Sequence, residues 1–137
     1  VSSKDFRKAA HRKRKMLGGG MRQAGVIAAA GLVALKETPP LIEQDHVNAR
    51  KLAKGMAEIP GLLIEPEAVE TNLVFFRYKE GGIGLARFVS ELAERGILIG
   101  GDRQGISRAC THHQISAEDV ETVLAAMREV AAAAVLA

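Results

Sequence analysis

The sequence has no tryptophan and only one cysteine, Cys110. A single cysteine excludes a disulfide within the chain and is typical of a reducing compartment, so we expect a cytoplasmic protein. Aromatic residues make up 4% of the chain, which predicts an aliphatic core. No apolar run reaches the roughly 20 residues of a membrane-spanning helix, and we expect neither a secretory signal nor a membrane partner.

What is present is typical of a globular fold: 137 residues, 47% of them hydrophobic and 26% charged. The net charge of +3 is unevenly distributed. Residues 1–22 carry eight Lys or Arg and one acid, Asp5, a net charge of +7, which leaves −4 for the remainder. Such a basic segment attracts an anion such as nucleic acid, an acidic partner or phosphate, unless it is simply a solvated helix face.

Hydrophobic periodicity predicts helices first and then an alternation of strands and helices. The expected helices are 5–16, 21–36, 39–58, 84–95 and one that follows Ser116, and the expected strands are 62–66, 71–78, 96–100 and 105–112. Thr38 before Pro39 is a helix-start signal, and Ser116 with Asp119 resembles a capping box. The helix over 21–36 is apolar all round and is expected to be buried on most sides. This order predicts an α/β fold (an α+β small domain), with helices packed on a small mixed or antiparallel sheet.

The string RKMLGGGMRQ contains three consecutive glycines between two cations, Lys15 and Arg22. Glycines permit a hard turn or a close approach to the backbone. If the turn frees backbone N–H groups, these and the flanking cations form an anion nest that suits a phosphate. The alternative is a helix-breaking turn with surface cations.

Arg108 is the second candidate. In an alternating strand it shares a face with Ile106 and Cys110, which both prefer burial. An arginine there needs a carboxylate or phosphate partner, and its planar fork suits a bidentate carboxylate. The alternatives are an internal salt bridge or an edge position in water. On this interpretation Cys110 is a small core residue.

His112 and His113 follow on the same strand. Adjacent strand residues point to opposite faces, so the two imidazoles are poor joint metal ligands, and no further ligand lies at metal-binding spacing. We expect no metal site, and we expect His112 to be a structural hydrogen-bonding residue.

Four strings together resemble the C-terminal part of the low-specificity L-threonine aldolases: RKMLGGGMRQAGVIAAAGLVAL, DHVNARKLAKGM, VETNLVFF and ISRACTHHQISAEDVE. These are pyridoxal 5'-phosphate (PLP) enzymes of the aspartate-aminotransferase-like fold, fold type I. The resemblance extends from about Asp5 to the last predicted helix. Cys110 and Gln114 depart from the family pattern Val-Thr-His-Leu-Asp-Val-Ser, which leaves the substrate range open.

The resemblance implies a domain organisation and three binding residues. Residues 1–36 are expected to be interdomain helices and a glycine-rich hinge leaving a large PLP domain, and residues 37–137 a small C-terminal α/β domain. Arg22 is implied to bind the cofactor phosphate, from a neighbouring subunit, with Lys15 close to the same site. Arg108 matches the arginine that binds the α-carboxylate of the amino-acid substrate. A shared phosphate site implies a homo-oligomer, a dimer or tetramer.

The implied activity is that of a carbon–carbon lyase of threonine catabolism, cleaving L-threonine or L-allo-threonine to glycine and acetaldehyde. The Schiff-base lysine of the family lies in a Ser-x-Ser-Lys-Gly loop upstream of this region, and no string here matches that loop. We therefore expect a fragment that lacks the catalytic lysine and is inactive alone. Two alternatives stay open: another fold type I lyase or transferase, and a nucleic-acid-binding module built on the basic helix.

Overall fold

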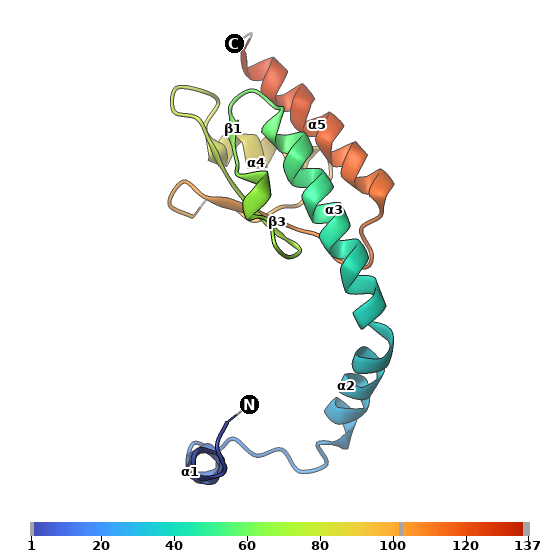
Figure 1. The fold of residues 1–137 in the computed structure, drawn as a ribbon. Coiled ribbons are helices and arrows are strands. Elements are labelled where there is room, and N and C mark those ends of the chain that lie inside the picture. The colour runs from blue at the N-terminus through green and yellow to red at the C-terminus, as the bar shows by residue number, and fades with distance from the viewer. Residues whose placement is uncertain (1, 102, 136–137) are drawn as a thin grey trace. The chain divides into compact units, whose positions relative to one another are not determined.

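The computed structural model describes residues 2–101 and 103–135. By their internal contacts the residues form a first unit, Val1–Glu37, and a second unit, Thr38–Ala137 (Figure 1). The first unit contains α1 (Lys4–Met16) and α2 (Gly25–Glu37). The second contains α3 (Pro39–Ala57), β1 (Leu62–Leu63), the short 3-10 helix η1 (Pro66–Ala68), β2 (Leu73–Tyr78), α4 (Leu85–Glu94), β3 (Ser107–Cys110) and α5 (Ala117–Val135). The roles expected for residues 1–36 and 37–137 stay a prediction.

Helix α1 is delimited by local signals at both ends. Ser3 is its N-cap, and the Ser3 hydroxyl accepts a hydrogen bond from the Phe6 N–H at 3.2 Å. At the other end Gly18 has φ +77°, a left-handed conformation that glycine adopts without strain. The Gly18 N–H donates to the Lys15 carbonyl and the Gly19 N–H to the Arg14 carbonyl, at 3.2 and 2.8 Å. This pair of bonds is a Schellman motif, which closes the helix.

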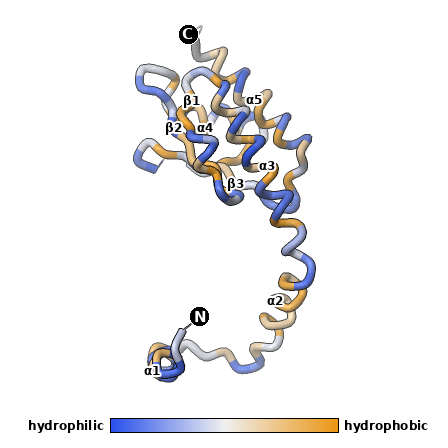
Figure 2. Tube along the Cα trace, viewed as in Figure 1, coloured by the Kyte–Doolittle hydropathy of each residue, from blue (hydrophilic) through white to orange (hydrophobic). Residues whose placement is uncertain are grey.

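Helix α2 begins at Gly25 rather than at the predicted position 21. Gln23 has φ +46°, which an α-helix does not allow, so the chain turns before the helix starts. Figure 2 shows hydrophobic colour along much of α2. No residue of α2 is buried, and Val26 and Leu35 are each 75% exposed. The expected burial on most sides is therefore not found within the first unit, whose described residues supply no covering surface for the helix.

The sheet of the second unit has the order β1-β2-β3, with both pairs antiparallel. In the register Phe75 lies opposite Arg108 and Arg77 lies opposite Leu63. Burial alternates along the strands, because successive side chains point to opposite faces. One face packs into the core through Val74, Phe76, Ser107 and Ala109. The other, which we call the open face, carries the exposed residues Leu63, Phe75, Arg77, Arg108 and Cys110.

Three helices close the core beneath the sheet. Helix α4 buries Leu85, Phe88 and Leu92, as its periodicity predicts. The Phe88 ring meets Phe76 edge-on at 6.4 Å and Tyr78 at 5.3 Å, so an aromatic cluster sits in a core that is otherwise mainly aliphatic. Helices α3 and α5 pack on each other, and α5 contributes Val120, Leu124, Met127 and Val130. The α/β prediction with an antiparallel sheet is confirmed.

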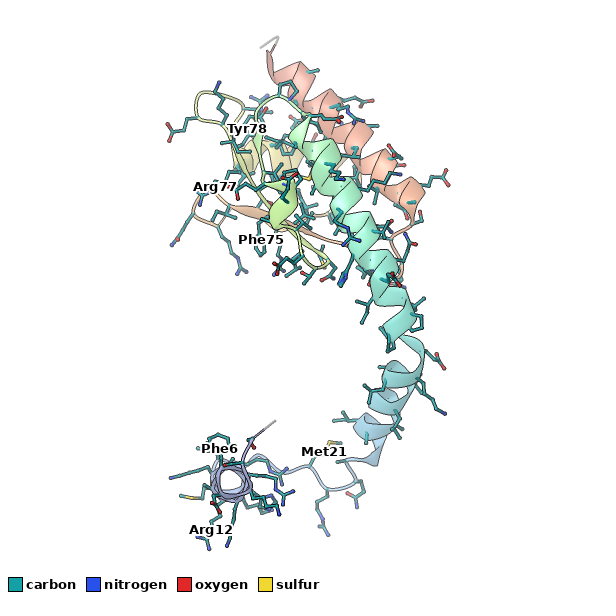
Figure 3. All side chains as sticks on the ribbon, viewed as in Figure 1. Phe6, Arg12, Met21, Phe75, Arg77 and Tyr78 are labelled. Carbon is teal, nitrogen blue, oxygen red and sulfur yellow. The ribbon has the colours of Figure 1, made fainter. Side chains whose placement is uncertain are left out.

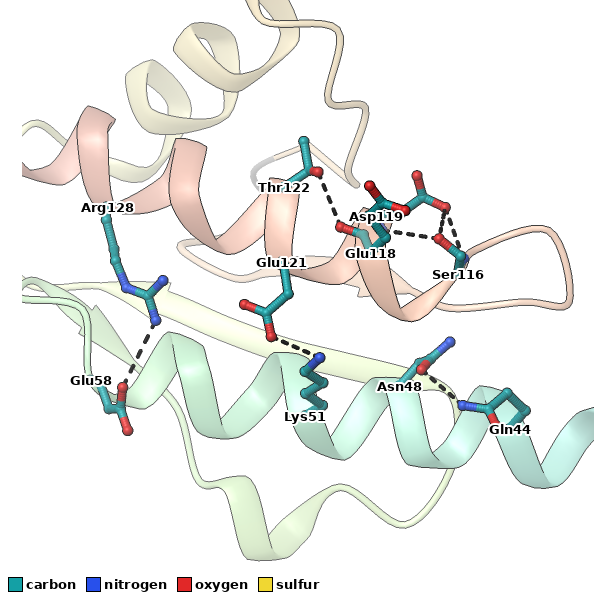
Figure 4. A network of polar contacts seen from close by, with 10 residues as sticks. All are labelled: Gln44, Asn48, Lys51, Glu58, Ser116, Glu118, Asp119, Glu121, Thr122 and Arg128. Atoms are coloured by element: carbon teal, nitrogen blue, oxygen red, sulfur yellow. Dashed lines mark hydrogen bonds and ion pairs between the residues drawn. The ribbon is translucent and has the colours of Figure 1, made fainter.

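Helix α5 starts with the predicted capping box (Figure 4). The Asp119 N–H donates to the Ser116 hydroxyl at 3.0 Å, and the Ser116 N–H donates to the Asp119 carboxylate at 2.8 Å. The Ser116 hydroxyl also donates to that carboxylate, at 2.7 Å. These bonds, the hydroxyl first and the backbone N–H second, lower the pKa of Asp119. Thr38 behaves differently, since its side chain makes no capping bond to α3.

Three predicted strands differ from the structure. Residues 96–100 form no strand, because Gly96 with φ +77° ends α4 and the segment makes only one backbone–backbone bond to β3, from the Gly100 N–H. The strand predicted at 62–66 shortens to two residues, since Pro66 begins η1. The strand at 105–112 likewise narrows to β3, which follows a tight turn with Gln104 at φ +56°.

Within the described ranges no single helix is long and apolar enough to cross a membrane. Together, α2 and α3 have the length and composition of a membrane-spanning segment, but they are bent by 65° where they meet. Helix α3 nevertheless buries Leu52 and Met56 in the core of its own unit.

Candidate functional site

Arg108 projects from the middle of β3 on the open face, beside its register partner Phe75. Figure 3 labels Phe75 and Arg77, the neighbouring open-face residues of β2. Among the described residues no carboxylate forms an ion pair with Arg108. Of the alternatives that the sequence left open, an internal salt bridge is therefore not formed with any described residue. The Arg108 side chain is exposed on the open face.

Cys110 lies on this face too, and it is exposed rather than buried. The expectation of a small core residue is therefore wrong. The reason is the pleat of β3: Ser107, Ala109 and Thr111 take the covered side, so the residues between them point away from the helices. The expectation that Ile106 is buried also fails in part, since Ile106 is half-buried.

The backbone of Arg108 is held by the segment that precedes the β3 turn. The Gly100 N–H donates to the Arg108 carbonyl at 2.8 Å, and the Ser107 hydroxyl donates to the Gly100 carbonyl. A Cβ built on Gly100 would lie 2.8 Å from the Arg108 carbonyl oxygen, which is closer than real Cβ atoms approach backbone. Only glycine fits this approach without a shift.

The end of β3 is held by a second set of bonds. Asn72 bonds to both backbone groups of Thr111. The Asn72 side-chain amide donates to the Thr111 carbonyl at 2.7 Å, and the Asn72 main-chain carbonyl accepts the Thr111 N–H at 3.0 Å. The buried Thr111 hydroxyl donates to the Asp45 carbonyl of α3 at 2.8 Å. These contacts fix the strand that carries Arg108 against the helical layer.

His112 and His113 are exposed on the turn beyond β3. His112 Nδ1 accepts the Gln114 N–H at 3.3 Å, as expected of a structural hydrogen-bonding residue. The two rings lie 6.0 Å apart. Among the described residues no group of three or more His, Cys, Asp or Glu side chains is arranged to hold a metal ion.

In the first unit Lys15 and Arg22 lie at the glycine segment, both exposed. The Lys15 ammonium lies 3.6 Å from the place that a Cβ would occupy on Gly20. The proposed nest of free glycine amides is not formed, because the N–H groups of Gly18, Gly19 and Gly20 all donate to backbone carbonyls. The glycines close α1, and an anion site at this segment would have to be formed by the side chains of Lys15 and Arg22, whose roles stay a prediction.

The sequence-predicted residues thus fall into the two units, Lys15 and Arg22 in the first and Arg108 in the second. Sequence reasoning missed the contacts of Gly100 and Asn72 with β3. The adjacent glycines 100 and 101 after an apolar run are the signal for a close backbone approach at the first position. For Asn72, no sequence signal reveals its partner 39 residues away.

The fold has a counterpart among solved structures. The chain is similar to an aminotransferase TlmJ from Streptoalloteichus hindustanus, with a TM-score of 0.58. That comparison covers 75% of this chain and 35% of the other, at 19% identity, which shows the fold alone. The fold is a mixed α/β arrangement with a small antiparallel sheet.

The family follows from the sequence. A family model described as beta-eliminating lyase matches residues 1–79, which is more than half of the chain. The chain therefore belongs to the beta-eliminating lyase family.

Two curated relatives cover nearly all of this chain. Low-specificity L-threonine aldolase 1 of Arabidopsis thaliana is 38% identical over 130 residues, which are 94% of this chain and 36% of that protein. Low specificity L-threonine aldolase of Escherichia coli (strain K12) is 36% identical over 129 residues, 93% of this chain and 36% of that protein. The chain thus spans about a third of the length of these relatives, and the predicted resemblance to threonine aldolases is confirmed.

Proposed function

We propose that this chain is the C-terminal portion of a PLP-dependent aldolase that cleaves L-threonine or L-allo-threonine to glycine and acetaldehyde. The observation that carries the proposal is the identity of 36–38% to two proteins named as low-specificity threonine aldolases, extending over at least 93% of this chain. A match that covers 93–94% of the chain extends over both the glycine segment and the strand with Arg108.

In this proposal Arg108 binds the α-carboxylate of the amino-acid substrate. Its guanidinium is exposed on the open face and has no ion-pair partner among the described residues. A planar guanidinium donates two parallel hydrogen bonds to a carboxylate, which fixes the orientation of the substrate as well as binding its charge.

Arg22 and Lys15 are proposed to hold the cofactor phosphate. The donor set fits this group: both cations are exposed, neither forms an ion pair with a described residue, and Lys15 lies over the glycine segment. When bound, PLP supplies the electron sink for cleavage of the Cα–Cβ bond. The contribution of this chain is to hold the phosphate and the substrate carboxylate, so that the bond to be broken is oriented.

The proposal extends to the partners. The Schiff-base lysine and the large PLP domain are expected from the part of the relatives that this chain does not span. If Arg22 reaches the phosphate of a neighbouring subunit, the enzyme is a homo-oligomer. We also propose a cytoplasmic location, since the single cysteine suits a reducing compartment.

The first test is Arg108→Ala in the intact enzyme, with Arg77→Ala as the matched control. Both changes remove an exposed arginine from the open face, but only Arg108 is assigned to the substrate. Hydrogen bonds to charged groups are worth about 1.5–3 kcal/mol, so we expect kcat/KM for threonine to fall roughly 10- to 150-fold in Arg108→Ala. The assay is the release of acetaldehyde. Equal effects of the two substitutions would reject the role of Arg108.

The second test is cofactor retention in Arg22→Ala, with Arg12→Ala in the body of α1 as the control. Dialysis followed by the absorbance of the bound cofactor measures the loss. We expect Arg22→Ala to lose cofactor at a phosphate concentration where Arg12→Ala keeps it. The wild-type enzyme provides a separate check of the reaction. If it binds the cofactor but forms no acetaldehyde from threonine, it catalyses another reaction of the same cofactor class.

A further inference from the structure

Beyond its place on the open face, Arg108 has an unusual backbone environment. The segment that leaves α4 approaches β3 without forming a strand, and its last residue, Gly100, makes a single backbone–backbone bond to β3. The Gly100 N–H donates to the Arg108 carbonyl at 2.8 Å. On the other edge of β3, Arg108 faces Phe75 in the ladder with β2. Gly100 therefore holds the Arg108 carbonyl at the edge of β3 that faces away from β2.

The atoms nearest to the open position at Gly100 come from Arg108. The three atoms nearest to a Cβ built on Gly100 are the Arg108 carbonyl oxygen at 2.8 Å, its nitrogen at 3.5 Å and its Cβ at 3.6 Å. A methyl group there meets backbone rather than the end of a flexible side chain, so the strand must move at Arg108. Gly100 is exposed and contributes no core packing, so the movement is local.

We propose that Gly100 is a positioning residue for Arg108. The close approach of the two backbones sets where β3 presents its arginine, and with it where the guanidinium meets the substrate carboxylate. The inference rests on the proposed role of Arg108. It goes further in assigning the geometry of substrate binding to a glycine that touches no substrate.

The chain offers a matched control in the adjacent residue. A Cβ built on Gly101 meets nothing within 4 Å, and neither glycine has a positive φ. Gly100→Ala and Gly101→Ala therefore add the same methyl group to neighbouring exposed positions. Only the first one presses on Arg108.

The experiment is steady-state kinetics of the intact enzyme with threonine. A misplacement of about 1 Å costs on the order of 100-fold, and the overlap at Gly100 is a fraction of that, so we expect KM to rise about 10-fold in Gly100→Ala. We expect kcat and the melting temperature to change little, and Gly101→Ala to match the wild type. A KM in Gly100→Ala equal to that in Gly101→Ala would overturn the proposal.

A second background separates positioning from a general structural effect. Arg108→Lys keeps the charge but loses the bidentate fork, so it is expected to raise KM by itself. If Gly100 acts through Arg108, adding Gly100→Ala to this background raises KM by less than it does in the wild type. Equal factors in both backgrounds would overturn the proposal. An unchanged KM in Arg108→Lys would instead reject the proposed function of Arg108, a distinguishable result.

Should Gly100→Ala fail to fold, Ser107→Ala provides the same test without added volume. It removes the hydroxyl that donates to the Gly100 carbonyl, so the backbone of Gly100 is held less firmly against β3. We expect a smaller rise in KM, again with little change in kcat, and again reduced in the Arg108→Lys background. An unaltered KM in a folded Ser107→Ala enzyme would count against the proposal.

Discussion

Helix α5 lies close against α3 at Gly55, where two opposing effects of a single methyl group can be compared. A Cβ built on Gly55 overlaps Leu124 Cδ1 and lies 2.7 Å from Leu124 Cδ2. Alanine is favoured over glycine in a helix interior by about 1 kcal/mol. Overpacking a core costs about 1–3 kcal/mol. Leu124 is only 3% exposed and has no room to withdraw, so the overpacking cost dominates.

Gly55→Ala is therefore expected to lower the free energy of unfolding by roughly 1 kcal/mol. In a chain with a shorter side chain at position 124, Gly55→Ala should instead raise the free energy of unfolding. Leu124→Ala alone is expected to cost about 2–5 kcal/mol because it leaves a cavity. In that background the overlapping methyl groups are gone, so Gly55→Ala gains its helix preference of about 1 kcal/mol and fills part of the cavity.

The assay is equilibrium urea denaturation of the 137-residue chain and its three variants, followed by far-ultraviolet circular dichroism. The four free energies of unfolding form a double-mutant cycle, which isolates the interaction between the two positions. The reasoning is refuted if Gly55→Ala stabilises the wild-type chain. It is equally refuted if Gly55→Ala changes the free energy of unfolding by the same amount in both backgrounds.

Three further predictions concern the second unit. Ser116 lowers the pKa of Asp119, so the stability from this cap is present at neutral pH and is lost as the pH falls through the lowered pKa. In Asp119→Asn the melting temperature is expected to fall less steeply as the pH is lowered. The same steepness as in the wild type would contradict the contribution of the capping box. Lys51 bonds to Glu121 at 2.7 Å and lowers its pKa through that hydrogen bond and its charge (Figure 4). Glu121→Gln should destabilise the chain in low salt and much less in about 1 M salt, where the Debye length is about 3 Å. An equal loss of stability at the two salt concentrations would argue against an ionic contribution. Finally, the exposed Cys110 thiol should react with Ellman's reagent in the folded chain about as readily as in urea, and protection would contradict its place on the open face.

Much of the helical structure could be predicted from neighbouring residues. The stripe of Leu85, Phe88 and Leu92 and the box of Ser116 with Asp119 identify α4 and α5, because these signals depend on residues three or four positions apart. The strand β2 was predicted from its β-branched and aromatic content.

The errors arise where an element depends on distant partners. The apolar residues 96–100 have strand composition, but a strand needs a ladder, and this segment makes one backbone bond to β3. Three glycines suit either an anion nest or a helix end, and the destination of their N–H groups decides between the two. The apolar α2 was expected to be buried, but burial requires a covering surface that local sequence does not reveal.

By itself the sequence determined the helices, the main strand, the resemblance to threonine aldolases and the common face of Arg108 and Cys110. These depend on local spacing and on the types of residue present. Only the tertiary structure decided that this common face is the exposed one, that the glycines close α1, and that Gly100 lies against Arg108. Alternation along a strand defines two faces, but the helices that cover one of them come from elsewhere in the chain.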